Sequence, residues 1–173
     1  MNENEYKVAS KRMRFFISLI CLLLPQKVKH WLLIKVLGYE IHSSAIIGLS
    51  LICPGHLIMK KKSWIGGLNV CKDGVELLSI GEYGRIGNLN WITAAPLGVK
   101  SYSDEVDRKP MLIVGNHSAI TRRHLIDCTN LVKIGKYSTF AGFRSQILTH
   151  AVDLLDCKQA SHPVLIGDYC FIG

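Results

Sequence analysis

The feature that most constrains the fold of this chain is an apolar residue that recurs every six positions from Ile41 onward. The step slips a few times and otherwise runs through Ile41, Ile47, Cys53, Met59, Ile65 and Cys71, then Ile80, Ile86 and Ile92, then Val114, Ile120, Ile126 and Val132, then Ile134 and Phe140, and last Ile166 and Ile172. Six is a multiple of the two-residue period of a strand and fits the 3.6-residue period of a helix poorly. Each hexad is therefore predicted to be a short strand and a corner. One hexad cannot bury its own apolar side, so the repeats are predicted to stack into a solenoid.

Glycine follows the apolar position in many hexads, as in Ile47-Gly48 and Ile65-Gly66. We expect this glycine to let the backbone turn tightly at the corner. Two polar segments interrupt the six-residue spacing, at Thr93–Met111 and Ala151–Pro163. They are predicted to be loops that leave corners of the solenoid, where binding and catalytic sites tend to be built. His150 directly precedes the second loop, at a position where other hexads mostly carry small or apolar residues.

Residues 1–38 differ from the rest of the chain in charge and in apolar pattern. They carry seven basic and two acidic residues, so they hold most of the formal net charge of +8. The apolar run Phe15–Pro25 is too short to span a bilayer as a helix, which takes about 20 residues. Together with the stretch that begins at Trp31, it is predicted to form two short helices in the membrane interface. The alternative is a helical cap over the end of the main domain, because both structures share one periodicity.

The charge distribution and the cysteines narrow the class of protein further. A nucleic-acid-binding domain usually has a basic stripe across its fold, whereas here the charge lies on an N-terminal segment, so no nucleic-acid partner is predicted. No two of the six cysteines have C-x-x-C spacing, and reduced thiols are expected. We therefore predict a cytoplasmic protein that contacts the inner face of a membrane through residues 1–38.

The hexads, "THAVD" at 149–153 and "PVLIGDYCFIG" at 163–173 together resemble the hexapeptide-repeat acyltransferases, and most closely the sugar O-acetyltransferase pattern. The resemblance covers roughly residues 30–173. It implies a mainly β fold, a left-handed parallel β-helix, over residues 39–173. The left hand comes from the resemblance alone, since connection rules favour right-handed crossovers. In such a helix three hexads complete a coil. This spacing stacks Ile47 on Ile65, and Cys53 on Cys71 at about 4.8 Å as buried apolar residues rather than a disulfide.

The resemblance also implies a reaction and a site. Members of the family are typically homotrimers and transfer an acyl group, usually acetyl from acetyl-CoA, to a hydroxyl or amine. Their catalytic histidine corresponds to His150, and histidine suits the removal of a hydroxyl proton near neutral pH. Asp153 is predicted to orient His150 or to hold the acceptor, with the capping of a turn as the alternative. Arg144 and Gln146, on the same coil, are predicted to bind a sugar-like substrate.

Other functions and residues stay open at this stage. N-acylation of an amino sugar, acylation of a small molecule such as serine, and an inactive scaffold are alternatives within the same fold. Arg122 and Arg123 are weaker candidates for the CoA phosphates, and Trp64 and Trp91 for a coil face or trimer contact. Zinc-dependent carbonic anhydrase activity of the gamma type is the least favoured reading and no metal is predicted, because His117 and His124 lack the third ligand that zinc needs.

The last hexad is cut short at Gly173. Related solenoids continue with further coils that complete the CoA site. We therefore expect the acyltransferase domain to be truncated at its C-terminus, and no CoA contacts are assigned.

Overall fold

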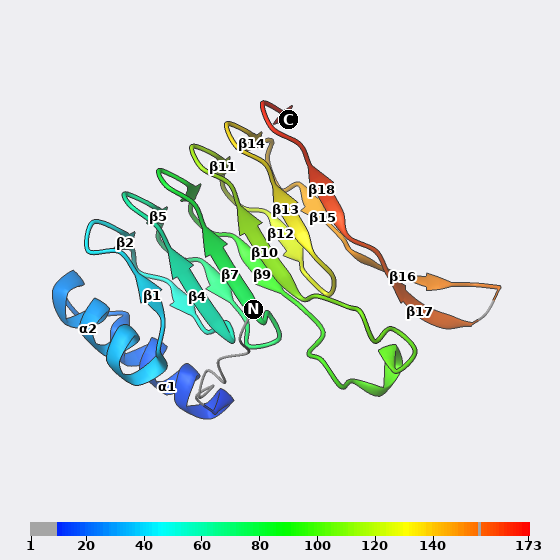
Figure 1. Cartoon of the computed structure of the whole chain (residues 1–173), viewed down its shortest axis with the longest axis horizontal. Helices are drawn as coiled ribbons and strands as arrows, with labels where there is room; N and C mark the ends of the chain where they lie inside the picture. Colours follow the sequence, from blue (N-terminus) through cyan, green and yellow to red (C-terminus); the bar gives the residue numbers. More distant parts are fainter. Residues whose placement is uncertain (1–9, 156) are drawn as a thin grey trace, which may run out of the picture.

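The computed structural model describes residues 10–155 and 157–173, and shows two helices followed by a stack of short parallel strands (Figure 1). Lys7 and the two glutamates of the N-terminal segment lie outside the described residues. Helix α1 spans Lys11–Cys21 and helix α2 spans Gln26–Leu37. Gly38 ends α2 at a φ of 69°, a left-handed conformation that glycine adopts without a Cβ clash. Among the described residues, no helix has the length and apolar character needed to cross a bilayer.

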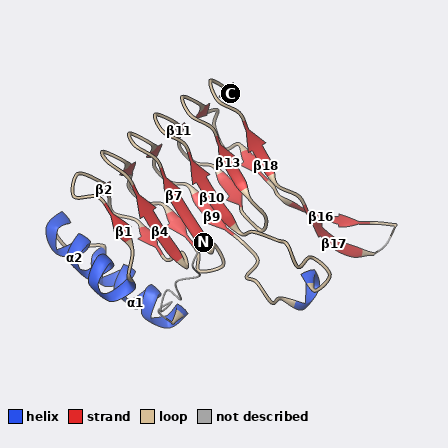
Figure 2. Ribbon diagram, viewed as in Figure 1, coloured by secondary structure: helices blue, strands red, loops and turns tan. Residues whose placement is uncertain are grey.

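The strands form three parallel stacks, which the chain visits in turn (Figure 2). The first stack contains β1 (Glu40–Ile41), β4 (His56–Met59), β7 (Leu77–Ile80), β10 (Met111–Val114), β13 (Val132–Ile134) and β18 (Val164–Ile166). The second stack contains β2 (Ile46–Ile47), β5 (Trp64–Ile65), β8 (Arg85–Ile86), β11 (Ala119–Ile120), β14 (Thr139–Phe140) and β19 (Phe171–Ile172). The third stack contains β3 (Leu51–Ile52), β6 (Val70–Cys71), β9 (Trp91–Thr93), β12 (Leu125–Asp127) and β15 (Gln146–Ile147). The prediction of stacked strands is confirmed, in an arrangement consistent with a parallel β-helix.

From Ile41 to Phe140 the apolar positions of the six-residue step are buried inside the stacks, whereas Ile166 and Ile172 in the last coil are partly exposed. Ile65, Ile86 and Ile120 align across neighbouring coils of the second stack, and each is almost completely buried. Burial of one such side chain stabilises the fold by about 1.5–3 kcal/mol. From the first stack to the second, the chain takes six residues in every coil, as from Ile80 to Ile86. The step from the third stack back to the first varies in length, and both predicted interruptions leave from this one corner.

The predicted stacking of the cysteines is wrong by one residue. Ile47 pairs with Ile65 as expected, but the residue that pairs with Cys71 is Ile52. The corner after Ile47 is one residue shorter than the corner after Ile65, so Cys53 falls just beyond the strand. Its N–H donates to the carbonyl of Cys71 at 3.0 Å, and both thiols are buried and free.

The glycines that follow the buried positions have a different role from the predicted one. Their backbone is not left-handed; they are needed because the next coil approaches closely. A Cβ at Gly87 would lie 1.9 Å from the carbonyl oxygen of Thr121, and one at Gly115 would lie 2.5 Å from that of Gly135. Positive φ angles fall instead on corner residues with side chains, among them Tyr83 at 56°.

Polar side chains form a column inside the corner between the second and third stacks. The Asn69 Oδ1 accepts hydrogen bonds from the backbone N–H of Asn90 at 2.9 Å and from its side-chain amide at 3.0 Å. The Asn90 Oδ1 in turn accepts from the backbone N–H of His124 at 3.0 Å. The column continues with His124, whose Nε2 lies 2.8 Å from the hydroxyl of Thr121 and whose side chain is buried. Buried polar groups need such partners.

Replacing His124 with asparagine is expected to flatten the pH dependence of stability. Burial lowers the pKa of His124 below its ordinary 6.5, so the unfolded chain takes up a proton before the folded protein does. The stabilisation by the neutral side chain is full above about pH 6.5 and is lost as the pH falls through the folded-state pKa. Urea midpoints at about pH 7.5 and about pH 5.5 measure this loss. An equal decrease in wild type and variant would contradict the assignment.

Candidate active site at the base of the hairpin

His150 lies at the start of an antiparallel hairpin that projects from the stack. The second predicted loop forms this hairpin, from β16 (His150–Asp153) and β17 (Lys158–Ser161), and its first pair is His150 with Ser161. Figure 1 shows the hairpin leaving the edge of the stack opposite the two helices. The His150 side chain is 42% exposed. Its imidazole is therefore held at one edge and open to an incoming molecule.

A buried carboxylate lies directly against His150. The Asp127 side chain is 5% exposed, and its Oδ2 lies 2.9 Å from the His150 Nδ1. The chain reaches Asp127 at the end of β12, one coil before the histidine. The His150 Nε2 has no hydrogen bond to any described residue. The pair thus has the geometry of a base and its positioning group, with the second ring nitrogen facing outward.

Two threonines hold the Asp127 carboxylate. The Thr149 hydroxyl donates to Oδ2 at 2.6 Å, and the Thr149 backbone N–H donates to the same oxygen at 3.1 Å. The Thr129 hydroxyl donates to Oδ1 at 2.7 Å. Burial by itself would raise the pKa of Asp127, but the hydrogen bonds from Thr149, His150 and Thr129 outweigh it and lower that pKa below 3.8. Because an ionised carboxylate only accepts hydrogen bonds, the Nδ1 of His150 carries the proton and Nε2 carries the lone pair.

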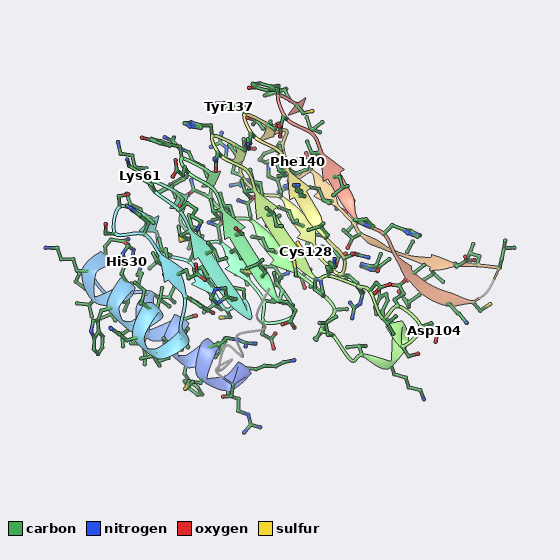
Figure 3. All side chains as sticks on the ribbon, in the orientation of Figure 1. His30, Lys61, Asp104, Cys128, Tyr137 and Phe140 are labelled. Atoms are coloured by element: carbon green, nitrogen blue, oxygen red, sulfur yellow. The ribbon has the colours of Figure 1, made fainter. Side chains whose placement is uncertain are left out.

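The first interruption braces the hairpin from the side. It contains the 3₁₀ turn η1 (Lys100–Tyr102), and Figure 3 shows Asp104 on this loop close to the hairpin. Glu105 accepts hydrogen bonds from both the backbone N–H and the hydroxyl of Ser161. Since Ser161 pairs with His150, the loop fixes the strand that faces the histidine. Lys158 also donates to Asp104 at 2.9 Å.

A buried arginine anchors the same loop to the strand ends. Arg108 donates to the carbonyl of Ala95 at 2.7 Å, that of Thr129 at 3.1 Å and that of Pro96 at 2.6 Å. Its guanidinium lies 4.5 Å from the centre of the Tyr102 ring. The two interruptions are therefore one assembly around the residues that hold Asp127.

Asp153 does not occupy the predicted orienting position, because the carboxylate in contact with His150 is that of Asp127. The Asp153 Oδ1 accepts the backbone N–H of Leu155 at 2.9 Å. This hydrogen bond caps the turn at the tip of the hairpin. The aspartate of "THAVD" thus lies at the far end of β16 from His150, and its other predicted role, to hold the acceptor, stays a prediction.

Arg144 and Gln146 lie on exposed parts of the coil that precedes His150. Arg144 occupies the corner between the second and third stacks at a φ of 57°, and its guanidinium lies 5.4 Å from the Phe143 ring. The Arg123 guanidinium lies 5.3 Å from the centre of the same Phe143 ring. Gln146, in β15, pairs with Leu125 of β12. The structure gives neither Arg144 nor Gln146 a contact with His150, so their substrate-binding role stays a prediction.

The histidines of the zinc alternative lie at different corners. His117 stacks between Tyr83 and Tyr137, with ring centres 4.8 and 4.9 Å apart, whereas His124 belongs to the buried polar column. Tyr137 is visible at the corner far from the hairpin in Figure 3. Within residues 10–155 and 157–173, no group of three His, Cys, Asp or Glu side chains could hold a metal ion.

Asp127 is the candidate site residue that the sequence analysis missed. One signal was present, because "IDCT" at 126–129 places an acidic residue directly after a buried position of the step. The pairing of Ile126 with Ile147 then brings residue 127 beside the segment 148–150. That pairing could not be derived from the hexads, since the step from Phe140 to Ile147 is seven residues long.

Comparison with known proteins gives this chain no relative. No protein-family model, no curated protein and no solved structure matches it.

Proposed function

We propose that this protein is a hexapeptide-repeat acyltransferase that transfers acetyl from acetyl-CoA to a hydroxyl of a sugar or saccharide intermediate. In this proposal the parallel stacks form a left-handed β-helix and the protein is a homotrimer. The six-residue step and the two interruptions that leave one corner support the fold. The observation that carries the reaction is the 2.9 Å contact between the His150 Nδ1 and the buried Asp127 Oδ2.

The geometry suits general-base catalysis of acyl transfer. The Nε2 of His150 takes the proton of the acceptor hydroxyl as its oxygen forms a bond to the thioester carbonyl carbon. The tetrahedral intermediate then collapses, the carbon–sulfur bond breaks, and the proton passes from Nε2 to the departing thiolate of CoA. Asp127 fixes the ring and stabilises the imidazolium that forms between these steps.

A trimer would place the exposed side of His150 against a neighbouring copy. The imidazole is 42% exposed, whereas a reaction that must exclude water needs a more enclosed groove. A second subunit packed along the stack supplies the missing wall. The mass of the protein in solution, measured by light scattering, tests this part of the proposal, and a monomer at working concentration would contradict it.

Acetyl-CoA is expected to stabilise the protein against heat. At a ligand concentration of about 100 times Kd, binding adds about 2.7 kcal/mol to the free energy of unfolding, which raises Tm by roughly 5–10 °C for a chain of this size. Thermal melts in the presence of acetyl-CoA measure the effect, with ATP as the control for unspecific binding of a nucleotide. No rise at millimolar acetyl-CoA contradicts the choice of donor.

The class of acceptor is tested by a screen that follows CoA release. Neutral sugars, amino sugars and serine are supplied in parallel with acetyl-CoA, and free thiol is measured with a chromogenic disulfide. We expect turnover with a neutral sugar, which has hydroxyl groups and no amine. Turnover with an amino sugar or serine alone would assign one of the alternative reactions, and thermal stabilisation with no turnover on any acceptor would favour an inactive scaffold.

A further inference from the structure

Both N-terminal helices bury polar side chains against the strands and expose large apolar ones, and this is most marked in α1. The buried residues of α1 are Arg14, Ser18 and Cys21, and those of α2 are Lys29, Leu33 and Leu37. The outward sides carry large apolar residues. In an ordinary surface helix the apolar stripe faces the core and the polar side faces water. Two features therefore need a physical reason: the polar residues on the buried side of the helices and the apolar residues on the exposed side.

The reason on the inner side is the open edge of the first coil. The strands of this coil have carbonyl groups with no preceding coil to receive them. The Ser18 hydroxyl donates to the carbonyl of Ile52 at 2.6 Å, and Gln26 and Lys29 donate to that of Ile47 at 2.5 and 3.0 Å. Polar side chains are required on this side because they complete the backbone hydrogen bonding of the sheet edge.

The outer side has no such partner among residues 10–155 and 157–173. The apolar helix face is defined by six exposed residues of the two helices and the turn between them: Phe16, Leu19, Ile20, Leu23, Trp31 and Ile34. Leu23 is 88% and Phe16 is 61% exposed. Large apolar residues exposed together on two neighbouring helices mark an interaction site. Both helices lie together over the first coil (Figure 1), so these residues belong to one end of the molecule.

The charge around the apolar helix face indicates which kind of partner binds it. Residues 10–39 contain six basic residues and no acidic one. Of the six, Lys11, Arg12, Lys27 and Lys35 have exposed side chains. Two copies of the face brought together would place like charges against like charges, which disfavours a symmetric contact between subunits. Apolar side chains within a ring of lysine and arginine match the acyl region and the phosphates of an anionic bilayer.

A groove beside α1 extends the apolar helix face. It has a volume of about 600 Å³, and its walls include Phe15, Leu51, Val70 and Trp91. Lys11, Arg12, Lys72 and Asp73 also line it, and the Lys11 Nζ lies 3.8 Å from the Asp73 Oδ2. Apolar walls with a net positive charge at the rim repeat the chemistry of the helix face on the outer side of the third stack.

We infer that the apolar helix face docks this protein on an anionic membrane surface. The helices lie in the interface with their buried sides on the first coil and their exposed apolar residues among the lipid headgroups and upper acyl chains. The inference does not depend on the proposed reaction. Four strand spacings of about 4.8 Å separate β3 from β15, so His150 lies roughly 20 Å from the helix-covered end along the stack.

The test is co-sedimentation of the full chain with vesicles. We expect binding to vesicles of phosphatidylcholine and phosphatidylglycerol in equal parts, and little binding to phosphatidylcholine alone. Lys27→Gln with Lys35→Gln should weaken the binding about 25-fold, because each cation near an anionic surface contributes about fivefold. Leu23→Gln with Trp31→Gln should weaken it at least about tenfold through loss of apolar burial. Val106→Gln, at an 87% exposed residue of the first interruption, is the matched control and should bind as wild type does.

A second measurement locates the contact. The chain has three tryptophans, and Trp64→Phe with Trp91→Phe leaves Trp31 as the only one. Its fluorescence should shift to the blue and be quenched by brominated lipid, whereas a variant that retains only Trp64 should show neither change. If wild type fails to pellet with anionic vesicles, the inference is wrong. If Leu23→Gln with Trp31→Gln instead lowers the mass of the free protein in light scattering and leaves vesicle binding unchanged, a second copy covers this face and the inference is also wrong.

Discussion

Replacement of His150 by alanine is expected to lower kcat for acetyl transfer by about 10²–10⁴-fold, the usual contribution of a positioned general base. The side chain is 42% exposed, so its loss leaves no cavity in the core and the protein should keep its Tm within a few degrees. The variant should still be stabilised by acetyl-CoA, since the imidazole acts on the acceptor hydroxyl and not on the nucleotide. Steady-state release of CoA, together with thermal melts of the same preparation, measures both effects.

His42→Ala is the matched control for this variant. His42 is another exposed histidine, and it lies after β1 at the opposite end of the stack, so its removal should leave kcat unchanged. High concentrations of free imidazole should restore part of the activity of His150→Ala, because a small base can enter the vacated position. Full activity in His150→Ala would falsify the proposed mechanism.

Replacement of Asp127 by asparagine is expected to lower kcat by about 10²–10³-fold with little change in KM. An amide has nearly the shape of the carboxylate, but its N–H₂ group can donate to Nδ1 and so favours the tautomer with the proton on Nε2. That tautomer cannot accept a proton from the acceptor. The negative charge that stabilises the imidazolium is lost as well. Separate measurement of kcat and KM distinguishes this effect from a general loss of substrate binding.

Asp153→Asn provides the comparison that separates the two carboxylates. The structure places Asp153 at the turn of the hairpin, where its Oδ1 accepts the N–H of Leu155, so this variant should lose far less activity than Asp127→Asn. If the order of the two losses is reversed, the aspartate of "THAVD" supports the reaction and the assignment of Asp127 is wrong.

The loss of stability that Asp127→Asn causes relative to wild type should depend on pH. The pKa of Asp127 is lowered in the folded protein, so its carboxylate stabilises the fold fully above the unfolded-state value near 3.8. This contribution is lost as the pH falls through the folded-state pKa. The difference in free energy of unfolding between wild type and Asp127→Asn should therefore be constant near neutral pH and shrink only in strongly acidic solution. A difference that shrinks already near neutral pH would contradict the hydrogen-bonded, ionised state of the carboxylate.

The sequence was sufficient for the parts of the structure that depend on local repetition. A step of six residues, with an apolar residue such as Ile86 or Ile120 at each step, allows short stacked strands and excludes long helices. The two polar interruptions were also recognised, because each breaks the step. The helical character of the N-terminal segment followed in the same way from its apolar periodicity. Each of these features depends on the alternation of apolar and polar residues along a short stretch of chain.

The contacts across coils could not be predicted in this way. Asp127 and His150 are separated by 23 positions, and their contact depends on the corner lengths that pair Ile126 with Ile147. The error of one residue at Cys53 has the same origin, since a corner can lose or gain a residue and still keep an apolar residue inside. The polar inner side of α1 likewise depends on a contact between distant segments, because Ser18 donates to the carbonyl of Ile52.

The sequence by itself thus determined that this chain stacks strands, that two segments leave the stack, and that His150 opens the second of them. Only the tertiary structure decided which carboxylate meets His150, that both segments leave one corner and brace each other, and which side of each helix is left exposed. The physical reason is that burial of apolar side chains is recorded residue by residue in the sequence. The hydrogen bonds that hold the Asp127 carboxylate depend on distances between coils, and these distances are fixed only when the whole stack has formed.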